Sequence, residues 1–438
     1  MGNQRQSLPN VPYRQGDDWP AYARQVLGWN WLTWLLNFAD RGLIGPLLPL
    51  IITAFGISYG EAGGIVSLFF VGYLSTFAGG LLSDRFGRKK LSTVSVFGYG
   101  AATCVTAAAP GVGFLAGVRI ATGVFEGLQY PAAAAWVSES YPYHRRGRAL
   151  AIWETGYSLG TLLGTLLATV LGAAYGWRAP WLVSGGLSIA AGVLFAKFVR
   201  ERPRTQTPGY DEAMALRADQ PTPRLRDVWR IRNVWVVFVL HGLYNFTFWM
   251  AATWIPEYVI HIRHLSFTSG GLLSGVLFGG VSVGLVLNGF VADHIGRVRT
   301  ISLLTFLSAL FLFAFTRTGD PVSLFVLMAL GGVFGAYISS AIALVTDTTN
   351  PRITGTAFGV ALFGGEIGAV LGPVTGGVLA QTLGLQSAIN VLPASLLAAA
   401  VLVWFARDPR AARRHRDADH HTNSPHTRMA APGREANH

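Results

Sequence analysis

Six ionisable side chains lie inside long apolar stretches of the chain: Asp40, Arg41, Arg119, Glu126, Glu154 and Glu366. A charged side chain in a membrane-spanning segment is costly, so each of these residues is a candidate for function. Arg119 and Glu126 are seven residues apart, which places them on one face of a helix, about 10 Å apart along its axis. If Asp40 and Arg41 face the same cavity, two guanidinium groups and two carboxylates meet there.

That combination favours the binding of an anion coupled to a proton. Arginine stays protonated, and its planar fork matches a carboxylate. Desolvation drives a buried acid toward its neutral form, and a neighbouring arginine drives it toward its charged form. A small change in its surroundings can therefore change whether the acid is protonated. Protonation of an acid then releases an arginine to hold the substrate anion. The alternative is a pair of structural salt bridges that tie helices together.

The composition indicates a membrane protein. Of the 438 residues, 51% are hydrophobic and 13% charged, whereas soluble domains carry about 25% charged residues. The formal charge of +12 is spread over short junctions between apolar stretches, which argues against nucleic-acid binding. We find no metal cluster, nucleophile elbow or phosphate loop, so an enzyme is disfavoured, and we expect no cofactor and no metal site.

Twelve segments are long enough to cross the hydrocarbon core as helices, which requires about 20 residues. Their approximate limits are 26–55, 61–82, 91–109, 112–137, 148–174, 177–197, 233–260, 268–291, 300–316, 321–345, 354–382 and 385–405. The predicted fold is an all-α membrane protein with two six-helix bundles, 26–197 and 233–406. The segment 1–25 and the linker 198–232 are predicted to be cytoplasmic, and 407–438 is predicted to be a disordered cytoplasmic tail. Metal binding by the histidines of this tail is the alternative.

The positive charges predict the orientation. All but five of the 34 arginines and lysines lie in the N-terminal segment, the even-numbered junctions, the linker and the C-terminal tail; the exceptions are Arg41, Arg119, Arg178, Arg263 and Arg317. Positively charged loops stay on the cytoplasmic side. Both termini are therefore expected in the cytoplasm. The strong excess of arginine over lysine is typical of a GC-rich bacterial genome and suggests the inner membrane.

The two halves repeat each other at an offset of about 208 residues. GGLLSDRFGRKK at 79–90 recurs as LNGFVADHIGRVR at 287–299, which aligns Asp84 with Asp293 and Arg88 with Arg297. Repeated bundles are typical of transporters whose substrate site lies between them near the midplane. The charges are asymmetric, however, since Asp40 and Arg41 align with Phe248 and Trp249.

The loop at 80–89, with its Gly-x-x-x-Asp-Arg-x-Gly-Arg-Lys pattern, resembles the signature of the major facilitator superfamily. The resemblance covers residues 25–406 and implies alternating access, with this loop and its weaker second copy acting as a cytoplasmic gate. The gating residues so implied are Asp84, Arg85, Arg88, Asp293 and Arg297. Topological anchoring by positive charge is the alternative.

The stretches at 38–49 and 119–149 resemble the anion:cation symporter branch of that superfamily. The resemblance implies that Arg41 and Arg119 engage the substrate anion, that Asp40 and Glu126 are protonated, and that Tyr73 lines the cavity. The branch usually has a neutral polar residue seven positions before the proline of the eleventh span, where this chain has Glu366. That acid is expected to bind a cationic group of the ligand, add a proton site or change selectivity.

Further candidates lie in the second half, where Tyr244, Asn245 and Trp249 are expected to shape the substrate site. Glu154 is a candidate proton relay or gate partner, whereas Glu257 is expected to be solvated at the outer end of the seventh span. Glycines in the fifth and eleventh spans, spaced by three or four residues, are expected to form smooth seams for rocking of the halves.

Together these residues predict a secondary active transporter that moves a small organic anion, such as a sugar acid, by proton-coupled symport. The alternatives are an anion exchanger, a proton-driven drug efflux antiporter and a sensor built on the same scaffold. The expected partners are the anion, protons and membrane lipids, and we expect the monomer to function.

Overall fold

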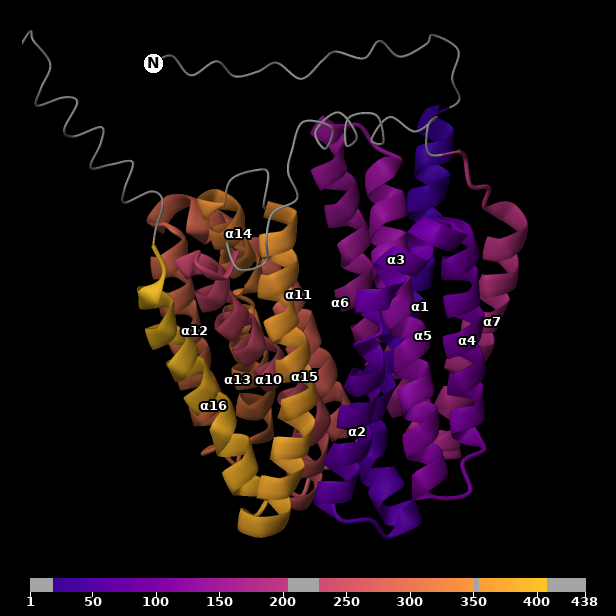
Figure 1. Cartoon of the computed structure of the whole chain (residues 1–438). Helices are drawn as coiled ribbons and strands as arrows, with labels where there is room; N and C mark the ends of the chain where they lie inside the picture. Colours follow the sequence, from indigo (N-terminus) through magenta and orange to yellow (C-terminus); the bar gives the residue numbers. More distant parts are fainter. Residues whose placement is uncertain (1–18, 204–227, 350–353, 408–438) are drawn as a thin grey trace, which may run out of the picture.

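The computed structural model describes residues 19–203, 228–349 and 354–407, which are helical almost throughout. The first half contains α1 (Trp19–Phe55), α2 (Tyr59–Tyr73), α3 (Thr76–Phe86), α4 (Arg88–Ala107), α5 (Val112–Glu139), α6 (Tyr143–Tyr175) and α7 (Arg178–Phe198). The second half contains α10 (Arg232–His261), α11 (Phe267–Ile295), α12 (Arg297–Phe315), α13 (Pro321–Gly335), α14 (Ile338–Thr348), α15 (Thr354–Leu383), α16 (Leu385–Leu402) and the short η2 (Val403–Phe405). The halves stand side by side as two helical bundles (Figure 1).

The predicted all-α architecture is confirmed. Two of the twelve spans are interrupted, the second between α2 and α3 and the tenth between α13 and α14. Ten spans are long and apolar enough to cross a membrane on those grounds alone, and the less apolar α4 and α5 complete the two bundles. The helix α1 begins at Trp19, earlier than the predicted residue 26. Most of the N-terminal segment, the linker and the tail lies outside the described residues.

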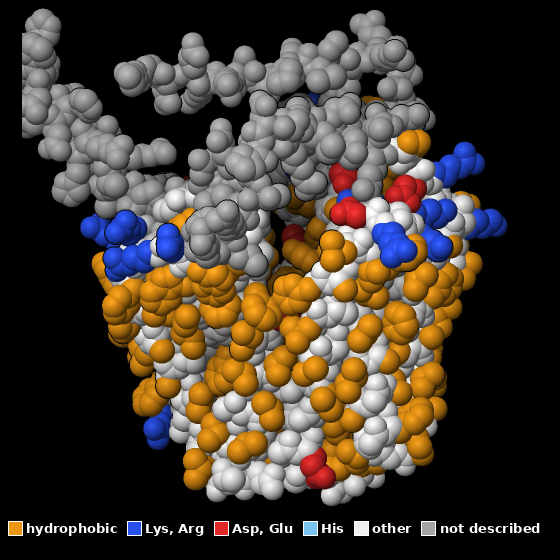
Figure 2. Space-filling model, viewed as in Figure 1, with side chains coloured by type: hydrophobic (Ala, Val, Ile, Leu, Met, Phe, Trp, Pro, Cys, Tyr) orange, Lys and Arg blue, Asp and Glu red, His pale blue; other side chains and the backbone are white. Residues whose placement is uncertain are grey.

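The outer surface is that of a membrane protein. A belt of hydrophobic side chains surrounds the bundles, and basic side chains gather near one end (Figure 2). Some of the largest apolar side chains are more than half exposed, including Leu81, Val170, Val286 and Phe290. A soluble protein rarely leaves so much apolar surface in contact with water. The belt therefore faces lipid.

The backbone confirms the internal repeat. The residues with positive φ in the described chain form three pairs at equivalent helix ends: Gly56 and His264, Gly87 and Gly296, and Gly176 and Gly384, each 208 or 209 residues apart. Gly87 and Gly296, in the two copies of the loop motif, have φ of 93° and 92°. Glycine adopts this left-handed conformation without the steric penalty that a side chain brings.

Two stripes of glycine pack helices together within each half. Gly160 and Gly164 of α6 lie against backbone carbonyls of α1, and Gly368 and Gly372 of α15 lie against carbonyls of α10. These four glycines serve ordinary helix packing, the alternative to a seam between moving halves; Gly377, at the end of the α15 stripe, lies against the Tyr59 carbonyl of the other half. Small residues let two helix backbones approach closely, and here they make each half rigid.

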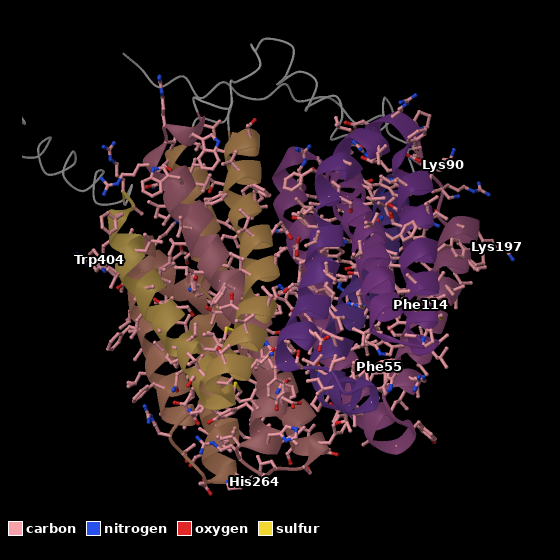
Figure 3. All side chains as sticks on the ribbon, turned by 60° about the horizontal axis from the view of Figure 1, so that its bottom comes forward. Phe55, Lys90, Phe114, Lys197, His264 and Trp404 are labelled. Atoms are coloured by element: carbon pink, nitrogen blue, oxygen red, sulfur yellow. The ribbon has the colours of Figure 1, made fainter. Side chains whose placement is uncertain are left out.

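Among the described residues, the tight contacts between the two halves lie toward one end. We call the end where α1 begins and α7 ends the linker end, and the opposite end the far end; Figure 3 labels Lys90 near the linker end and His264 near the far end. Toward the far end, the Ser67 hydroxyl of α2 donates to the Val370 carbonyl (2.6 Å) and accepts from the Val374 amide (3.1 Å) of α15. Toward the linker end, Figure 2 shows a hollow between the halves with an acidic side chain in its depth.

A methyl group at Gly63 is expected to loosen the far end. The added Cβ would overlap the backbone carbonyl of Pro373 in the other half, whereas a Cβ at the neighbouring Gly64 meets open space. Overpacking of this kind costs about 1–3 kcal/mol, so G63A should depopulate the conformation that is closed at the far end. We expect spin labels on Arg85 and His294, in a C104S background, to report a shorter mean distance at the linker end. G64A should leave that distance unchanged, and an equal response of the two variants would contradict the assignment.

Candidate functional site

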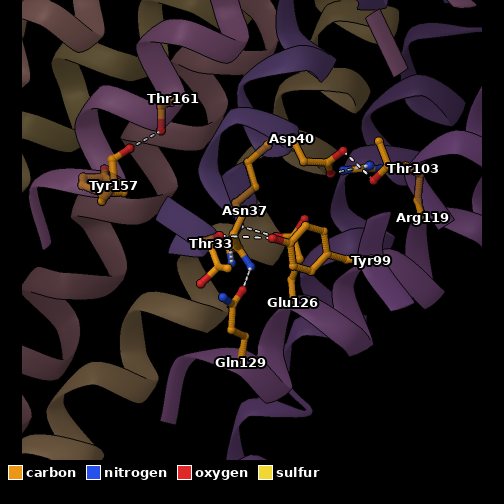
Figure 4. Close-up of polar contacts among 11 residues, drawn as sticks. Thr33, Asn37, Asp40, Tyr99, Thr103, Arg119, Glu126, Gln129, Tyr157 and Thr161 are labelled. Carbon is orange, nitrogen blue, oxygen red and sulfur yellow. Dashed lines mark hydrogen bonds and ion pairs between the residues drawn. The ribbon is translucent and has the colours of Figure 1, made fainter. Parts of the chain in front are cut away.

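The four charged residues of α1 and α5 form two ion pairs inside the first half. Arg41 Nε lies 2.7 Å from Glu126 Oε2, and Arg119 Nη1 lies 3.3 Å from Asp40 Oδ2. Adjacent residues of a helix point about 100° apart, which follows from 3.6 residues per turn. Asp40 and Arg41 therefore reach the two ends of the α5 face that carries Arg119 and Glu126. We call these four residues the charged core (Figure 4).

Neutral polar side chains complete the charged core. Thr103 Oγ1 of α4 donates to Asp40 Oδ1 (2.7 Å). Arg41 Nη2 donates to Asn37 Oδ1 (3.0 Å), and Asn37 Nδ2 donates to Gln129 Oε1 (3.0 Å). Sequence reasoning missed these three partners, although Asn37 is one helical turn from Arg41 and Gln129 is close to one turn from Glu126, spacings that place each pair on a common face.

The charged core is closed to solvent in this conformation. Asp40 and Glu126 are 0% exposed, Arg119 is 1% exposed and Arg41 is 6% exposed. The four residues do meet, as expected, but the expectation of a water-filled pocket around all of them is wrong. Within the described chain, Glu126 Oε1 and Arg119 Nε are buried without a hydrogen-bond partner. Loss of one partner of a buried ion pair costs about 3–5 kcal/mol, because it leaves the other charge buried and unpaired.

The two arginines have different surroundings. Arg119 lies between the rings of Phe69 and Trp181, 4.7 and 5.0 Å from their centroids, deep inside the first half. Arg41 lies against Phe38 and Tyr73, 4.2 and 4.1 Å from their centroids. Tyr73, against which Arg41 lies, is within electrostatic range of Glu366 in the second half, whereas both aromatic neighbours of Arg119 belong to the first half.

Glu366 faces Tyr73 and Arg41 across this boundary. On α15, the Phe363 ring contacts Phe77 of α3 (5.0 Å between centroids), and the Val370 carbonyl accepts the Ser67 bond described above. Glu366 lies about one turn from both contacts, which places it on the same face of α15. It is within electrostatic range of Arg41 and Tyr73. Glu366 is half-buried and makes no hydrogen bond or ion pair with another described residue.

Glu154 is the other acid of this region. It is exposed, and it lies one turn before Tyr157 on α6. The Tyr157 ring contacts Phe38 of its own half (4.6 Å) and Phe248 of α10 (6.1 Å), so this face of α6 looks toward the second half. Tyr130 of α5 is within electrostatic range of both Glu154 and Glu366. The structure therefore brings acids from both halves to the hollow.

The predicted residues of α10 form the facing wall. Trp249 is buried against Phe70 of α2 (4.8 Å), and its indole Nε1 donates to Asn245 Oδ1 (3.2 Å). Asn245 remains half-exposed. Tyr244 is buried and borders a cavity of about 40 Å³ inside the second half. Asn245 Nδ2 donates to the His241 carbonyl (3.4 Å), whereas the Tyr244 hydroxyl is buried without a hydrogen-bond partner among the described residues.

The loop motif between α3 and α4 is held by ion pairs within the first half. Arg88 Nη2 lies 2.8 Å from Asp84 Oδ1 and 2.7 Å from Glu139 Oε1, and Arg88 Nη1 donates to Ser83 Oγ. Glu201 accepts from the backbone amides of Arg88 and Lys89 (2.7 and 3.0 Å), so this acid of the linker caps α4. A carboxylate is favourable at a helix N-terminus. Sequence reasoning did not find Glu201.

The remaining predicted gate residues lie at the same level of the bundles. Arg85 is exposed and follows Asp84 at the end of α3, and Asp293 and Arg297 occupy the equivalent turn between α11 and α12. At the far end, the expectation of a solvated Glu257 is wrong. Glu257 is 1% exposed, lies 3.0 Å from His261 Nε2 and interacts with Tyr59 of the other half.

The chain matches the family model described as Major Facilitator Superfamily over residues 31–284 and 237–430. It is 26% identical to the D-galactonate transporter of Escherichia coli O6:H1, over 84% of this chain and 92% of that protein. It is 25% identical to the hexuronate transporter of Bacillus subtilis, over 86% and 93%. It is 27% identical to a probable sulfoacetate transporter of Cupriavidus necator, over 88% and 93%.

Solved structures share the fold. A bacterial homologue of the human lysosomal transporter Spinster, in an inward-facing and occupied conformation, superposes with a TM-score of 0.76 at 17% identity, covering 87% of this chain and 96% of that one. A D-xylose–proton symporter superposes with a TM-score of 0.72 at 16% identity, covering 89% and 99%. With its two repeated bundles, lipid-facing belt and hollow between the halves, the chain is a multi-pass membrane transporter, not an enzyme, and belongs to the Major Facilitator Superfamily.

Proposed function

We propose that this transporter carries an organic anion, a carboxylate such as a sugar acid, in symport with protons. The observation that carries the proposal is the pairing of Arg41 with Glu126 next to the boundary between the halves. The relatives named as galactonate, hexuronate and sulfoacetate transporters support an anionic substrate.

The contacts of the charged core suggest how a proton and an anion are coupled. Glu126 holds Arg41 through a charge-assisted bond, and Glu126 also interacts with the buried Asp40 carboxyl group. Repulsion between two neighbouring carboxylates is relieved when one of them takes up a proton. A protonated Glu126 no longer neutralises Arg41, whose fork then turns to the substrate carboxylate. Arg119 keeps Asp40 in place, which makes Arg119 a positioning residue.

Access alternates between the two ends. The tight contacts at the far end and the hollow at the linker end are consistent with one conformation of that cycle. We place both termini and the linker end in the cytoplasm of the inner membrane, because positively charged loops remain on that side. In this orientation the structure is inward-facing. We propose that Glu154, exposed at the hollow, relays the proton toward the cytoplasm.

Uptake by proteoliposomes tests the proposal. We expect an acidic exterior to drive accumulation of labelled D-galactonate or D-gluconate, and dissipation of the pH gradient to abolish it. Uptake that requires an internal anion and ignores the pH step would identify an exchanger instead. Uptake of organic cations against an opposing proton gradient would identify an efflux antiporter.

A further inference from the structure

The charges around the hollow do not balance. In the charged core, two arginines are matched by Asp40 and Glu126. Glu154 and Glu366 add two further carboxylates, and neither forms an ion pair with another described residue. The nearby base is His241, whose Nδ1 lies 3.1 Å from the Leu362 carbonyl. A simple anion that enters this site therefore meets two acids that no described arginine or lysine neutralises.

The position of Glu366 puts this unpaired acid on the opposite side of the boundary from Arg41. Arg41 belongs to the first half and Glu366 to the second; Arg41 lies 4.1 Å from the Tyr73 ring centroid, and Glu366 is within electrostatic range of Tyr73. A ligand between the halves thus has a cation on one side and an anion on the other. Gly365 allows His241 and Asn245 to lie directly over the α15 backbone beside Glu366, so the second wall offers polar groups at the same level.

We propose that the transported carboxylate also carries a positively charged amino group, with its carboxylate on Arg41 and its ammonium on Glu366. This inference rests on the proposed function and specifies its substrate class. A half-buried carboxylate without a partner loses hydration that no protein group replaces. A zwitterion supplies the partner that Glu366 lacks, whereas a plain carboxylate leaves Glu366 unpaired and is repelled by it. A simple cation is disfavoured by Arg41.

Matched ligand pairs test the inference on the purified full-length protein. Each pair differs by an amino group in place of a hydroxyl group: 2-amino-2-deoxy-D-gluconate and D-gluconate, 4-aminobutyrate and 4-hydroxybutyrate, and alanine and lactate. Binding is measured by thermal shift and calorimetry. We expect the amino compound of at least one pair to bind about 10-fold more tightly, the ratio that corresponds to about 1.4 kcal/mol. No preference for the amino compound in any of the three pairs overturns the inference.

Variants of Glu366 identify the residue responsible. E366Q should bring the two affinities of the preferred pair within about twofold, chiefly by weakening the amino compound, and E366D, which keeps the charge, should retain most of the preference. E139Q changes an acid of the loop network at the linker end and should leave the ratio unchanged. A preference that survives E366Q overturns the assignment. The wild-type ratio decides the substrate class even if E366Q does not fold.

The inference and the proposed function fail in different ways. If plain carboxylates accumulate under a pH gradient and the amino compounds gain nothing, symport stands and the zwitterion is excluded. If the amino compounds are preferred through Glu366 but uptake ignores the pH gradient, the substrate class stands and proton coupling is excluded.

Discussion

Replacement of Arg41 with lysine is expected to lower carboxylate uptake about 100-fold, the loss typical of a binding group misplaced by about 1 Å. The arginine bonds Glu126 through Nε and Asn37 through Nη2 at the same time, and its plane lies against Phe38 and Tyr73. A lysine ammonium keeps the charge but has neither the fork nor the planar face. Initial rates in proteoliposomes at saturating pH gradient measure the effect.

The matched control for R41K is R85K. Arg85 is exposed at the end of α3, and its aromatic neighbour is the adjacent Phe86. Both variants make the same chemical change, but only R41K alters the charged core. Uptake by R41K at the rate of the control would show that charge alone is sufficient, and bidentate recognition by Arg41 would have to be abandoned.

The sequence predicted the architecture well because its signals are long and repeated. Apolar segments of about 20 residues locate spans, and the helix ends at Arg178, Thr354 and Leu385 lie within one residue of the predicted limits. The two copies of the loop motif showed how the sequences of the two halves align. The positive φ that Gly87 and Gly296 share confirms this alignment. The breaks in the second and tenth spans left no comparable signal, since no proline interrupts α2 or α13 at the break.

The candidate site was predictable in its members but not in its exposure. Charge in an apolar segment singled out Asp40, Arg41, Arg119 and Glu126, and helical spacing put Arg119 and Glu126 on one face. Which acid pairs with which arginine depends on how α1 and α5 are rotated against each other, and a single sequence does not give that rotation. For the same reason, the burial of Arg119 against Trp181 and the position of Glu257 between the halves became visible only in the assembled bundles.

Replacement of Glu126 with glutamine is expected to abolish proton-driven accumulation while sparing exchange of the substrate across the membrane. The amide resembles the protonated acid: it leaves Arg41 without its counter-charge, so the guanidinium is always free to bind the anion. The Asp40 pair with Arg119 is unaffected. If one proton is carried with each monovalent anion, a gradient of one pH unit drives about 10-fold accumulation of the anion. E126Q should lose this accumulation.

Two measurements in the same proteoliposomes separate the expected outcomes for E126Q. With a gradient of two pH units, the wild type should approach about 100-fold accumulation of the anion, at 1.4 kcal/mol per tenfold, and E126Q should only equilibrate it. With substrate on both sides and no gradient, the two proteins should exchange labelled anion at rates within about 10-fold, a difference of about 1.4 kcal/mol, because exchange requires no net movement of protons. E139Q, which changes an acid of the loop network at the linker end, should retain proton-driven accumulation. If E126Q accumulates as the wild type does, the proton travels elsewhere, and Asp40 becomes the residue to test, because it is the other carboxyl group sealed beside the two arginines.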